Sequence, residues 1–335
     1  MSHIKNMLKH PQAANLHHLP DDLRWATPEI VADYRAERLK CGIIADLGCG
    51  IGFQAFAFAK TCTKVYAVEL DVRKLECARK NATILGLQNI KFIQGDILDP
   101  QIISGLADAE IIFCDPERLP EETTRELCKI KPDVQKLIEQ YQKITPQLAI
   151  EFPPQIKEIP FRCEREYLSV QGKLNRLTLY FGKLMKAERR AVMLPEKAVL
   201  QSGKSKVAQT KRLEQYLLEV NPAVVKAEVV GELCEKYGVK VYFTGKNTYG
   251  TSSKRVLSPF WTTFKVLQQL PFQETKILSA LQKEQAGNVI LRYDLEPEEY
   301  WPARTRYERN LRGSKTLCLF RFQEKAVIAE RVSPS

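Results

Sequence analysis

Asp46-Leu47-Gly48-Cys49-Gly50-Ile51-Gly52 is the most informative run in this chain of 335 residues. An apolar run, Cys41 to Ala45, precedes it and predicts a buried strand, and a helix-like stretch begins at Phe53. Glycines at alternate positions allow backbone conformations that a Cβ forbids, and the first turn of a helix offers unpaired N–H groups. The run therefore predicts a strand–turn–helix unit that holds a nucleotide.

The spacing of the glycines and the acid before them narrow the choice of ligand. The dinucleotide fingerprint is G-x-G-x-x-G, whereas Gly48, Gly50 and Gly52 follow a G-x-G-x-G pattern after Asp46. A carboxylate beside the turn repels a pyrophosphate and suits a cofactor with a cationic amino-acid end. We therefore expect S-adenosylmethionine as the cofactor and not NAD.

Acids also follow the next three predicted strands. These strands are Val65–Val68, Ile90–Ile93 and Ile111–Cys114, and the acids are Glu69, Asp96 and Asp115. Glu69 is placed to hold ribose hydroxyls, and it is preferred to Asp71 because Asp71 can cap the following helix. Asp96 can accept a hydrogen bond from the adenine amino group, and Ile97 can cover the adenine ring. These expectations put the acids along one rim of a parallel sheet.

The remaining pattern predicts two domains. Residues 1–40 are expected to be a helical segment, with Thr27 as the cap of a helix and Pro28 at its first position. Residues 41–185 are expected to form a doubly wound α/β sheet that ends in an antiparallel hairpin, 163–170 with 174–181. Residues 190–335 are expected to form a smaller α+β domain, with one helix over 224–237 and a polar loop over 244–255.

The ordered motifs resemble those of class I S-adenosylmethionine-dependent methyltransferases. Asp46–Gly52 matches their first motif, Glu69 their ribose acid, Asp96-Ile97 their adenine motif, and 115–118 their acceptor-side motif. Residues 25–36 look like the segment before the first motif in prokaryotic methyltransferases with a C-terminal THUMP-like domain, and the Thr-Pro-Glu within it is similar to trimethylguanosine synthases. The resemblance implies an RNA substrate, with guanine N2 as the favoured acceptor.

Asp115-Pro116 is the predicted chemical site. Methyl transfer needs an in-line nucleophile near 3–3.5 Å, so one carboxylate that accepts the acceptor N–H and orients its lone pair is enough. Pro116 stiffens the turn that aims Asp115. Arg118 can stack on a base or bind a phosphate, or it can pair with neighbouring glutamates. Cys114 could be a covalent nucleophile, but its place in an apolar strand favours a core role.

Composition excludes several other classes. The nine cysteines contain no C-x-x-C pair, and the four histidines, 3, 10, 17 and 18, all precede the predicted sheet, so we expect neither a metal site nor a histidine-based hydrolase. No apolar run approaches the roughly 20 residues of a membrane span, and the first twenty residues lack the apolar centre of a secretion signal. The sequence predicts a cytoplasmic protein without membrane partners, and its oligomeric state stays open.

The formal net charge of +11 is unevenly distributed. Residues 186–335 hold 26 Lys and Arg against 16 Asp and Glu, whereas residues 1–185 hold 25 against 24. A basic half joined to a neutral half favours a polyanionic partner, and Arg304, Arg306 and Arg309 lie in an Arg/aromatic run of the kind that binds RNA. The prediction is a methyltransferase acting on a base nitrogen of structured RNA, such as tRNA or rRNA. The alternatives are a small-molecule or protein methyltransferase, and a non-catalytic RNA-binding protein that retains the cofactor fold.

Overall fold

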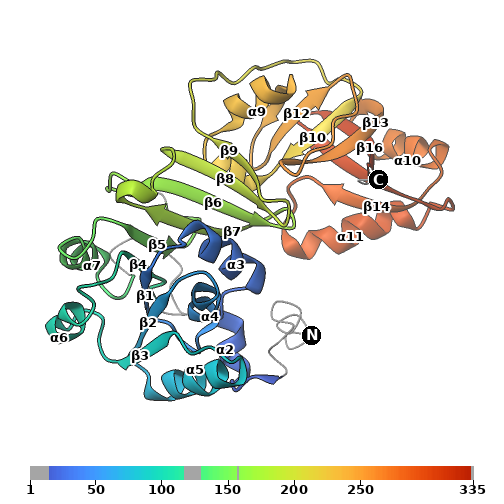
Figure 1. Ribbon diagram of the computed structural model, residues 1–335. Helices are drawn as coiled ribbons and strands as arrows, with labels where there is room; N and C mark the ends of the chain where they lie inside the picture. The colour runs from blue at the N-terminus through green and yellow to red at the C-terminus, as the bar shows by residue number, and fades with distance from the viewer. Residues whose placement is uncertain (1–14, 117–129, 157, 333–335) are drawn as a thin grey trace. The chain divides into compact units, whose positions relative to one another are not determined.

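The computed structural model describes residues 15–116, 130–156 and 158–332 (Figure 1). The chain forms two compact units, Met1–Val199 and Leu200–Ser335, called here the N-terminal and the C-terminal unit.

The N-terminal unit is built on one mixed sheet of nine strands. They are β1 (Ile43–Leu47), β2 (Lys64–Glu69), β3 (Ile90–Gln94), β4 (Ile111–Cys114), β5 (Leu148–Phe152), β6 (Glu164–Val170), β7 (Lys173–Tyr180), β8 (Arg189–Leu194) and β9 (Ala198–Gln201). The order is β3-β2-β1-β4-β5-β7-β6-β8-β9, and the first five strands are parallel. The strand order reverses between β1 and β4, which is where a doubly wound sheet binds its ligand. The predicted α/β class and the antiparallel β6–β7 hairpin are confirmed, but the hairpin does not end the sheet, because β8 pairs with β6 and β9 follows it.

Helices alternate with these strands. They are α2 (Pro20–Trp25), α3 (Glu29–Arg38), α4 (Phe53–Ala59), α5 (Val72–Ile84), α6 (Pro100–Ser104) and α7 (Val134–Tyr141). Helix α3 begins one residue later than predicted, because Pro28 is its N-cap and Thr27 makes no capping bond. A short 3-10 turn, η3 (Gly182–Leu184), follows the hairpin.

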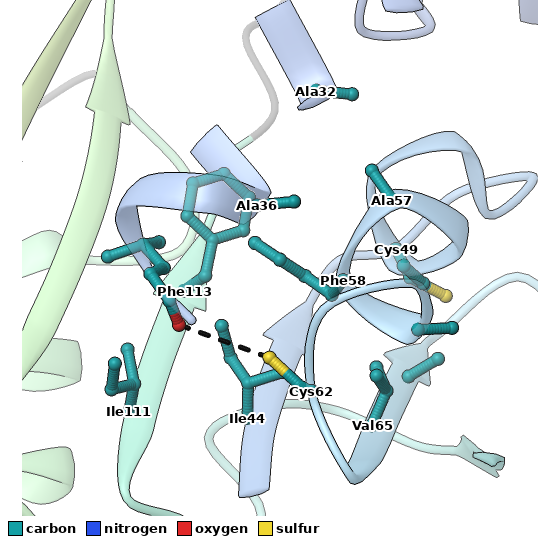
Figure 2. Packing of buried hydrophobic residues seen from close by; sticks show 14 of the residues in the cluster. Ala32, Ala36, Ile44, Cys49, Ala57, Phe58, Cys62, Val65, Ile111 and Phe113 are labelled. Carbon is teal, nitrogen blue, oxygen red and sulfur yellow. Dashed lines mark hydrogen bonds between the residues drawn. The ribbon is translucent and has the colours of Figure 1, made fainter. Parts of the chain in front are cut away.

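An apolar core joins α3 and α4 to the central strands. Figure 2 shows Phe58 of α4 and Phe113 of β4 beside Ala36 of α3. The two phenylalanine rings meet edge to face, with centroids 5.5 Å apart. Ile44 of β1 belongs to the same buried cluster. This packing fixes the ends of β1 and β4, from which the glycine turn and Asp115 extend.

The N-terminal unit extends further than the charge shift suggested. Strand β8 pairs with β6, and its Arg190 lies 3.6 Å from Glu164 and 3.5 Å from Glu166. Residues 190–199 therefore contribute to the first sheet, and the division falls after Val199 instead of within 182–190. Arg190 compensates two buried glutamates, so local charge was a misleading boundary signal.

The C-terminal unit contains a second sheet, of order β11-β12-β10-β13-β16-β15-β14. Its strands are β10 (Tyr216–Val220), β11 (Lys240–Thr244), β12 (Thr248–Ser252), β13 (Trp261–Pro271), β14 (Ala286–Arg292), β15 (Lys315–Phe322) and β16 (Lys325–Arg331). Its helices are α8 (Pro222–Lys226), α9 (Val230–Tyr237), α10 (Glu274–Lys283) and α11 (Pro297–Glu308).

Two predictions for this unit were wrong in detail. The single helix expected over 224–237 is divided into α8 and α9, because Glu228 adopts a left-handed φ of 56°. The loop expected over 244–255 contains strand β12, whose small and polar residues are buried between neighbouring strands. The Arg/aromatic run forms helix α11 and the residues directly after it.

Candidate active site

The glycine turn after β1 has the conformation that the sequence predicted. Gly48, Gly50 and Gly52 have φ values of 76°, 57° and 98°, which L side chains rarely adopt. A Cβ at Gly52 would collide with the ring of Phe56, whereas a Cβ at Gly50 would meet nothing within 4 Å. A Cβ at Gly48 would lie 3.6 Å from the carbonyl oxygen of Asp115. The turn therefore approaches the acceptor motif closely and leaves open space at Gly50.

Asp46 is the most unusual group in this region. Its residue is only 1% exposed, and its Oδ2 atom has no hydrogen-bond partner among the described residues. Burial raises the pKa of the carboxyl to about 8; the Arg35 guanidinium opposes this shift, and the Asp115 and Glu69 charges add to it. A buried carboxylate oxygen without a donor fits a cationic ligand group, such as the ammonium of S-adenosylmethionine.

Glu69 accepts hydrogen bonds from the glycine turn and from the turn that follows β2. One carboxylate oxygen accepts a 2.7 Å hydrogen bond from the Gly50 N–H, and the other accepts a 3.0 Å bond from the Asp71 N–H. Asp71 caps α5, because its carboxylate accepts hydrogen bonds from Arg73 N and Lys74 N. The cap prediction is thus confirmed. The ribose contact of Glu69 stays a prediction, and Glu69 also stabilises the glycine turn directly.

Asp96 and Ile97 lie in the turn after β3. Asp96 is exposed, and its carboxylate accepts a 2.8 Å hydrogen bond from the Leu98 N–H. Ile97 is half-buried, and its carbonyl accepts a 2.7 Å hydrogen bond from the Tyr141 hydroxyl of α7. Tyr141 was not predicted from the sequence. Its hydroxyl fixes the backbone of the predicted adenine motif.

Asp115 and Pro116 follow β4 directly, beside the glycine turn. Asp115 is half-buried and Pro116 is buried. Glu117 and Arg118 lie outside the described residues, so the predicted role of Arg118 stays a prediction. Cys114 is buried, and burial together with the Asp115 and Asp46 charges raises the pKa of its thiol well above the usual range. This environment disfavours a thiolate nucleophile and agrees with the expected core role.

Three charged residues near the rim, two of them buried and one half-buried, were not predicted from the sequence. Arg35 of α3 donates a hydrogen bond of 2.6 Å to Gln54, forms an ion pair with Glu151 of β5, and lies 4.5 Å from the centroid of the Phe113 ring. Glu151 also pairs with Arg176 of β7. No local motif marks these residues, because they come from separate elements and meet only in the fold. Their network supplies positive charge close to Asp46 and Asp115.

The predicted arginines of the C-terminal unit differ from one another in their surroundings. The Arg304 Nε lies 2.8 Å from the Glu308 carboxylate, and its guanidinium is 5.3 Å from the centroid of the Trp301 ring. Arg306 and Arg309 are exposed. Arg304 therefore carries a charge that Glu308 compensates, while Arg306 and Arg309 present theirs to solvent.

Metal-binding clusters and membrane-spanning helices are two further features to consider. Residues 15–116, 130–156 and 158–332 contain no group of three or more His, Cys, Asp or Glu arranged to hold a metal ion. In the same ranges, every helix is too short or too polar to cross a bilayer.

Comparisons with known proteins point to one class. Residues 41–170 match the family model of a methyltransferase domain. The chain is 24% identical over 315 residues to an uncharacterized S-adenosylmethionine-dependent methyltransferase of Mycobacterium tuberculosis, a match that covers 89% of this chain and 82% of that protein. It is also 34% identical over 87 residues to an uncharacterized RNA methyltransferase of Gloeobacter violaceus, which covers 26% of this chain and 18% of that protein.

A crystal structure shares the fold. It is that of a proposed methyltransferase from Porphyromonas gingivalis W83, with a TM-score of 0.78 and 16% identity, covering 98% of this chain and 88% of that chain. The matched domain, the strand order and the glycine turn together define the class: the N-terminal unit carries an S-adenosylmethionine-dependent methyltransferase domain. The predicted enzyme class and cofactor are confirmed.

Proposed function

We propose that this methyltransferase acts on a base nitrogen of a structured RNA such as tRNA or rRNA, with guanine N2 as the favoured acceptor. The observation that carries the proposal is the position of Asp115 beside the glycine turn, in a unit joined to a strongly basic one. The resemblance to THUMP-like domains and to trimethylguanosine synthases supports the same substrate class, as do partial matches to RNA methyltransferases.

The roles of the cofactor residues follow from their surroundings. S-adenosylmethionine supplies an electrophilic methyl group on a sulfonium centre. The Asp46 carboxylate would hold the ammonium group, Glu69 would hold the ribose, and Asp96 with Ile97 would hold the adenine. Gly48, Gly50 and Gly52 keep the backbone close without side chains in the way.

Asp115 acts on the acceptor. Its carboxylate accepts the N–H of the exocyclic amine, turns the nitrogen lone pair toward the methyl group and takes up the proton that leaves. Pro116 restricts the backbone that aims this carboxylate. Arg176 is half-buried and pairs with Glu151; the Glu151 and Asp115 charges raise the pKa of its guanidinium against the effect of burial, so a positive charge lies near Asp115.

The C-terminal unit would hold the RNA. Residues 200–335 hold 22 Lys and Arg against 14 Asp and Glu, an excess of +8. Residues 1–199 hold 29 against 26, an excess of +3. In this proposal the nearly neutral N-terminal unit carries out the chemistry, and the basic C-terminal unit binds the phosphates of the RNA.

Incubation with isotopically labelled S-adenosylmethionine and total tRNA or rRNA, followed by nucleoside mass spectrometry, tests the proposal. The expected product is N2-methylguanosine, absent when Asp115→Ala replaces the wild type. Label in protein or in small molecules but not in RNA would support the alternative methyltransferase substrates. Cofactor binding with no transfer to any RNA, protein or small molecule would support a non-catalytic role.

A further inference from the structure

A groove on the C-terminal unit has the composition of a phosphate site. It has a volume of about 370 Å³ and lies between strand β13 and helix α10. Its polar lining consists of Gln268, Thr275, Lys276, Ser279 and Lys283. Ammonium, hydroxyl and amide groups can all donate hydrogen bonds to phosphate oxygens.

The helical periodicity of α10 directs these side chains to one face. Lys276, Ser279 and Lys283 are spaced three and four residues apart and are exposed, whereas Ile277 and Leu281 are buried against the sheet. At 1.5 Å rise per residue the two lysines are about 10 Å apart along the axis. That separation spans about three nucleotides of a stacked strand at roughly 3.4 Å each.

Glu284 contacts one residue of the groove. Gln268 Nε2 donates a 2.9 Å hydrogen bond to the Glu284 carboxylate, so Glu284 orients the Gln268 amide. Ser279 Oγ donates its hydroxyl hydrogen to the Thr275 carbonyl at 3.0 Å, so the main donors that the groove offers a phosphate are the Lys276 and Lys283 ammonium groups.

The C-terminal end of α10 contacts the residues that follow α11. Gln282 Nε2, at the end of α10, donates a 3.0 Å hydrogen bond to the carbonyl of Asn310, just past the end of α11. Lys283 and Arg309 are the immediate neighbours of these two residues in the chain. The fold thus joins the basic ends of two helices that are separated by more than a strand in the sequence.

We propose that this groove binds the phosphodiester backbone of the RNA substrate; the inference rests on the proposed function. The lining favours a polyanion with regularly spaced charges, because two ammonium groups about 10 Å apart along α10 can meet phosphates about three nucleotides apart. The binding is independent of base identity, since phosphate contacts position the RNA and the active site selects the nucleotide.

The test compares two full-length double variants with the same change in charge. Lys276→Glu with Lys283→Glu alters the groove, and Lys226→Glu with Lys240→Glu alters exposed positions on α8 and β11. Affinity for a fluorescein-labelled RNA hairpin is measured against salt by fluorescence anisotropy, with cofactor affinity and thermal melting as folding controls. Each phosphate contact raises the RNA association constant by a factor of about 5 to 8 at 0.1 M salt. Because the groove variant loses two such contacts, we expect it to bind RNA at least about 25-fold more weakly.

In the groove variant, the slope of the logarithm of the RNA association constant against the logarithm of the salt concentration should be shallower by roughly 1.4 to 1.8. The matched variant should change RNA affinity less than about threefold. Equal weakening in both variants would overturn the groove inference, because bulk charge would then explain the effect. Wild-type RNA methylation with no loss in the groove variant would also overturn it while leaving the proposed function intact. A wild-type enzyme that neither binds nor methylates RNA would overturn the proposed function and the groove with it.

Discussion

The two units use charge in opposite ways. Among the described residues of the N-terminal unit, seven Asp, Glu and Arg residues are buried: Arg35, Asp46, Glu69, Glu151, Glu164, Glu166 and Arg190. Over residues 200–332 of the C-terminal unit, the buried polar residues are all neutral: Asn221, Thr248, Thr251, Ser252 and Thr263. Buried charge is costly and is screened little by salt, whereas interactions between exposed charges are largely screened beyond a Debye length of about 10 Å. This difference agrees with the proposed division, in which the N-terminal unit carries out the chemistry and the C-terminal unit holds a large anion.

The largest expected effect concerns the charge at the chemical site. Asp115→Ala should lower kcat for methyl transfer by about 1000-fold, because the acceptor loses both its orientation and its proton acceptor. Calorimetry should show unchanged S-adenosylmethionine affinity, since Asp115 is assigned to the acceptor. Asp115→Asn, which keeps an acceptor oxygen without charge, should retain more activity than Asp115→Ala. An equal loss of S-adenosylmethionine affinity in both variants would indicate that Asp115 binds the cofactor and not the acceptor.

Asp46→Asn tests the buried carboxylate. Loss of a buried charge pair costs about 3 kcal/mol, so cofactor affinity should fall by about 100-fold. The folded-state pKa of Asp46 is about 8, above its ordinary value of 3.8, so the folded protein without cofactor binds the extra proton and its stability falls as pH rises from about 4 to 8. The variant should therefore unfold at a higher temperature than the wild type at pH 8.5.

Asp71→Asn is the matched control for this prediction. An asparagine can still cap α5 by accepting from the Arg73 and Lys74 N–H groups, so neither cofactor affinity nor melting should change much. In the wild type, cofactor affinity should decline as pH falls below about 8, because the ammonium group binds the ionised form of Asp46. A pH-independent affinity between 6 and 9 would contradict the assignment.

A smaller effect is expected for the exposed arginines. Arg306→Glu with Arg309→Glu should weaken RNA binding by about tenfold or more at 0.1 M salt and leave cofactor affinity unchanged. Arg304 is kept, because its replacement would also unpair Glu308, which contacts the Val289 N–H at 3.0 Å. Anisotropy with the labelled hairpin measures the change, and an unaltered RNA affinity would remove α11 from the RNA surface.

The smallest effect is expected at Cys114. Cys114→Ser should keep methyl transfer within about threefold of the wild type, with a lower melting temperature because a hydroxyl replaces a buried thiol. Complete inactivity, together with a covalent RNA adduct seen by mass spectrometry, would establish a carbon-methylating mechanism that uses Cys114, instead of nitrogen methylation that uses Asp115.

The sequence predicted the parts of the site that lie on consecutive strand ends. Asp46, Glu69 and Asp115 follow apolar runs, and a parallel sheet brings such positions to one rim by construction. Arg35, Tyr141 and Arg176 could not be found in this way, because each reaches the rim from a helix or an antiparallel strand. Their side-chain positions depend on tertiary packing, which the periodicity of the local sequence does not predict.

The C-terminal unit was predicted less well for a related reason. Strand β12 has the composition of a loop and is held by pairing with β10 and β11 on both sides. The break between α8 and α9 depends on one left-handed residue, Glu228, which is not a glycine. Long-range pairing overrides local preference at both places.

The salt dependence of both affinities, measured on the wild-type enzyme, tests the division of labour between the units most directly. RNA affinity should fall steeply with salt, at a log–log slope of about −0.7 for each phosphate contact on single strands, whereas S-adenosylmethionine affinity should change less than about twofold over the same range. RNA binding that ignores salt, or cofactor binding that falls in parallel with it, would contradict the account.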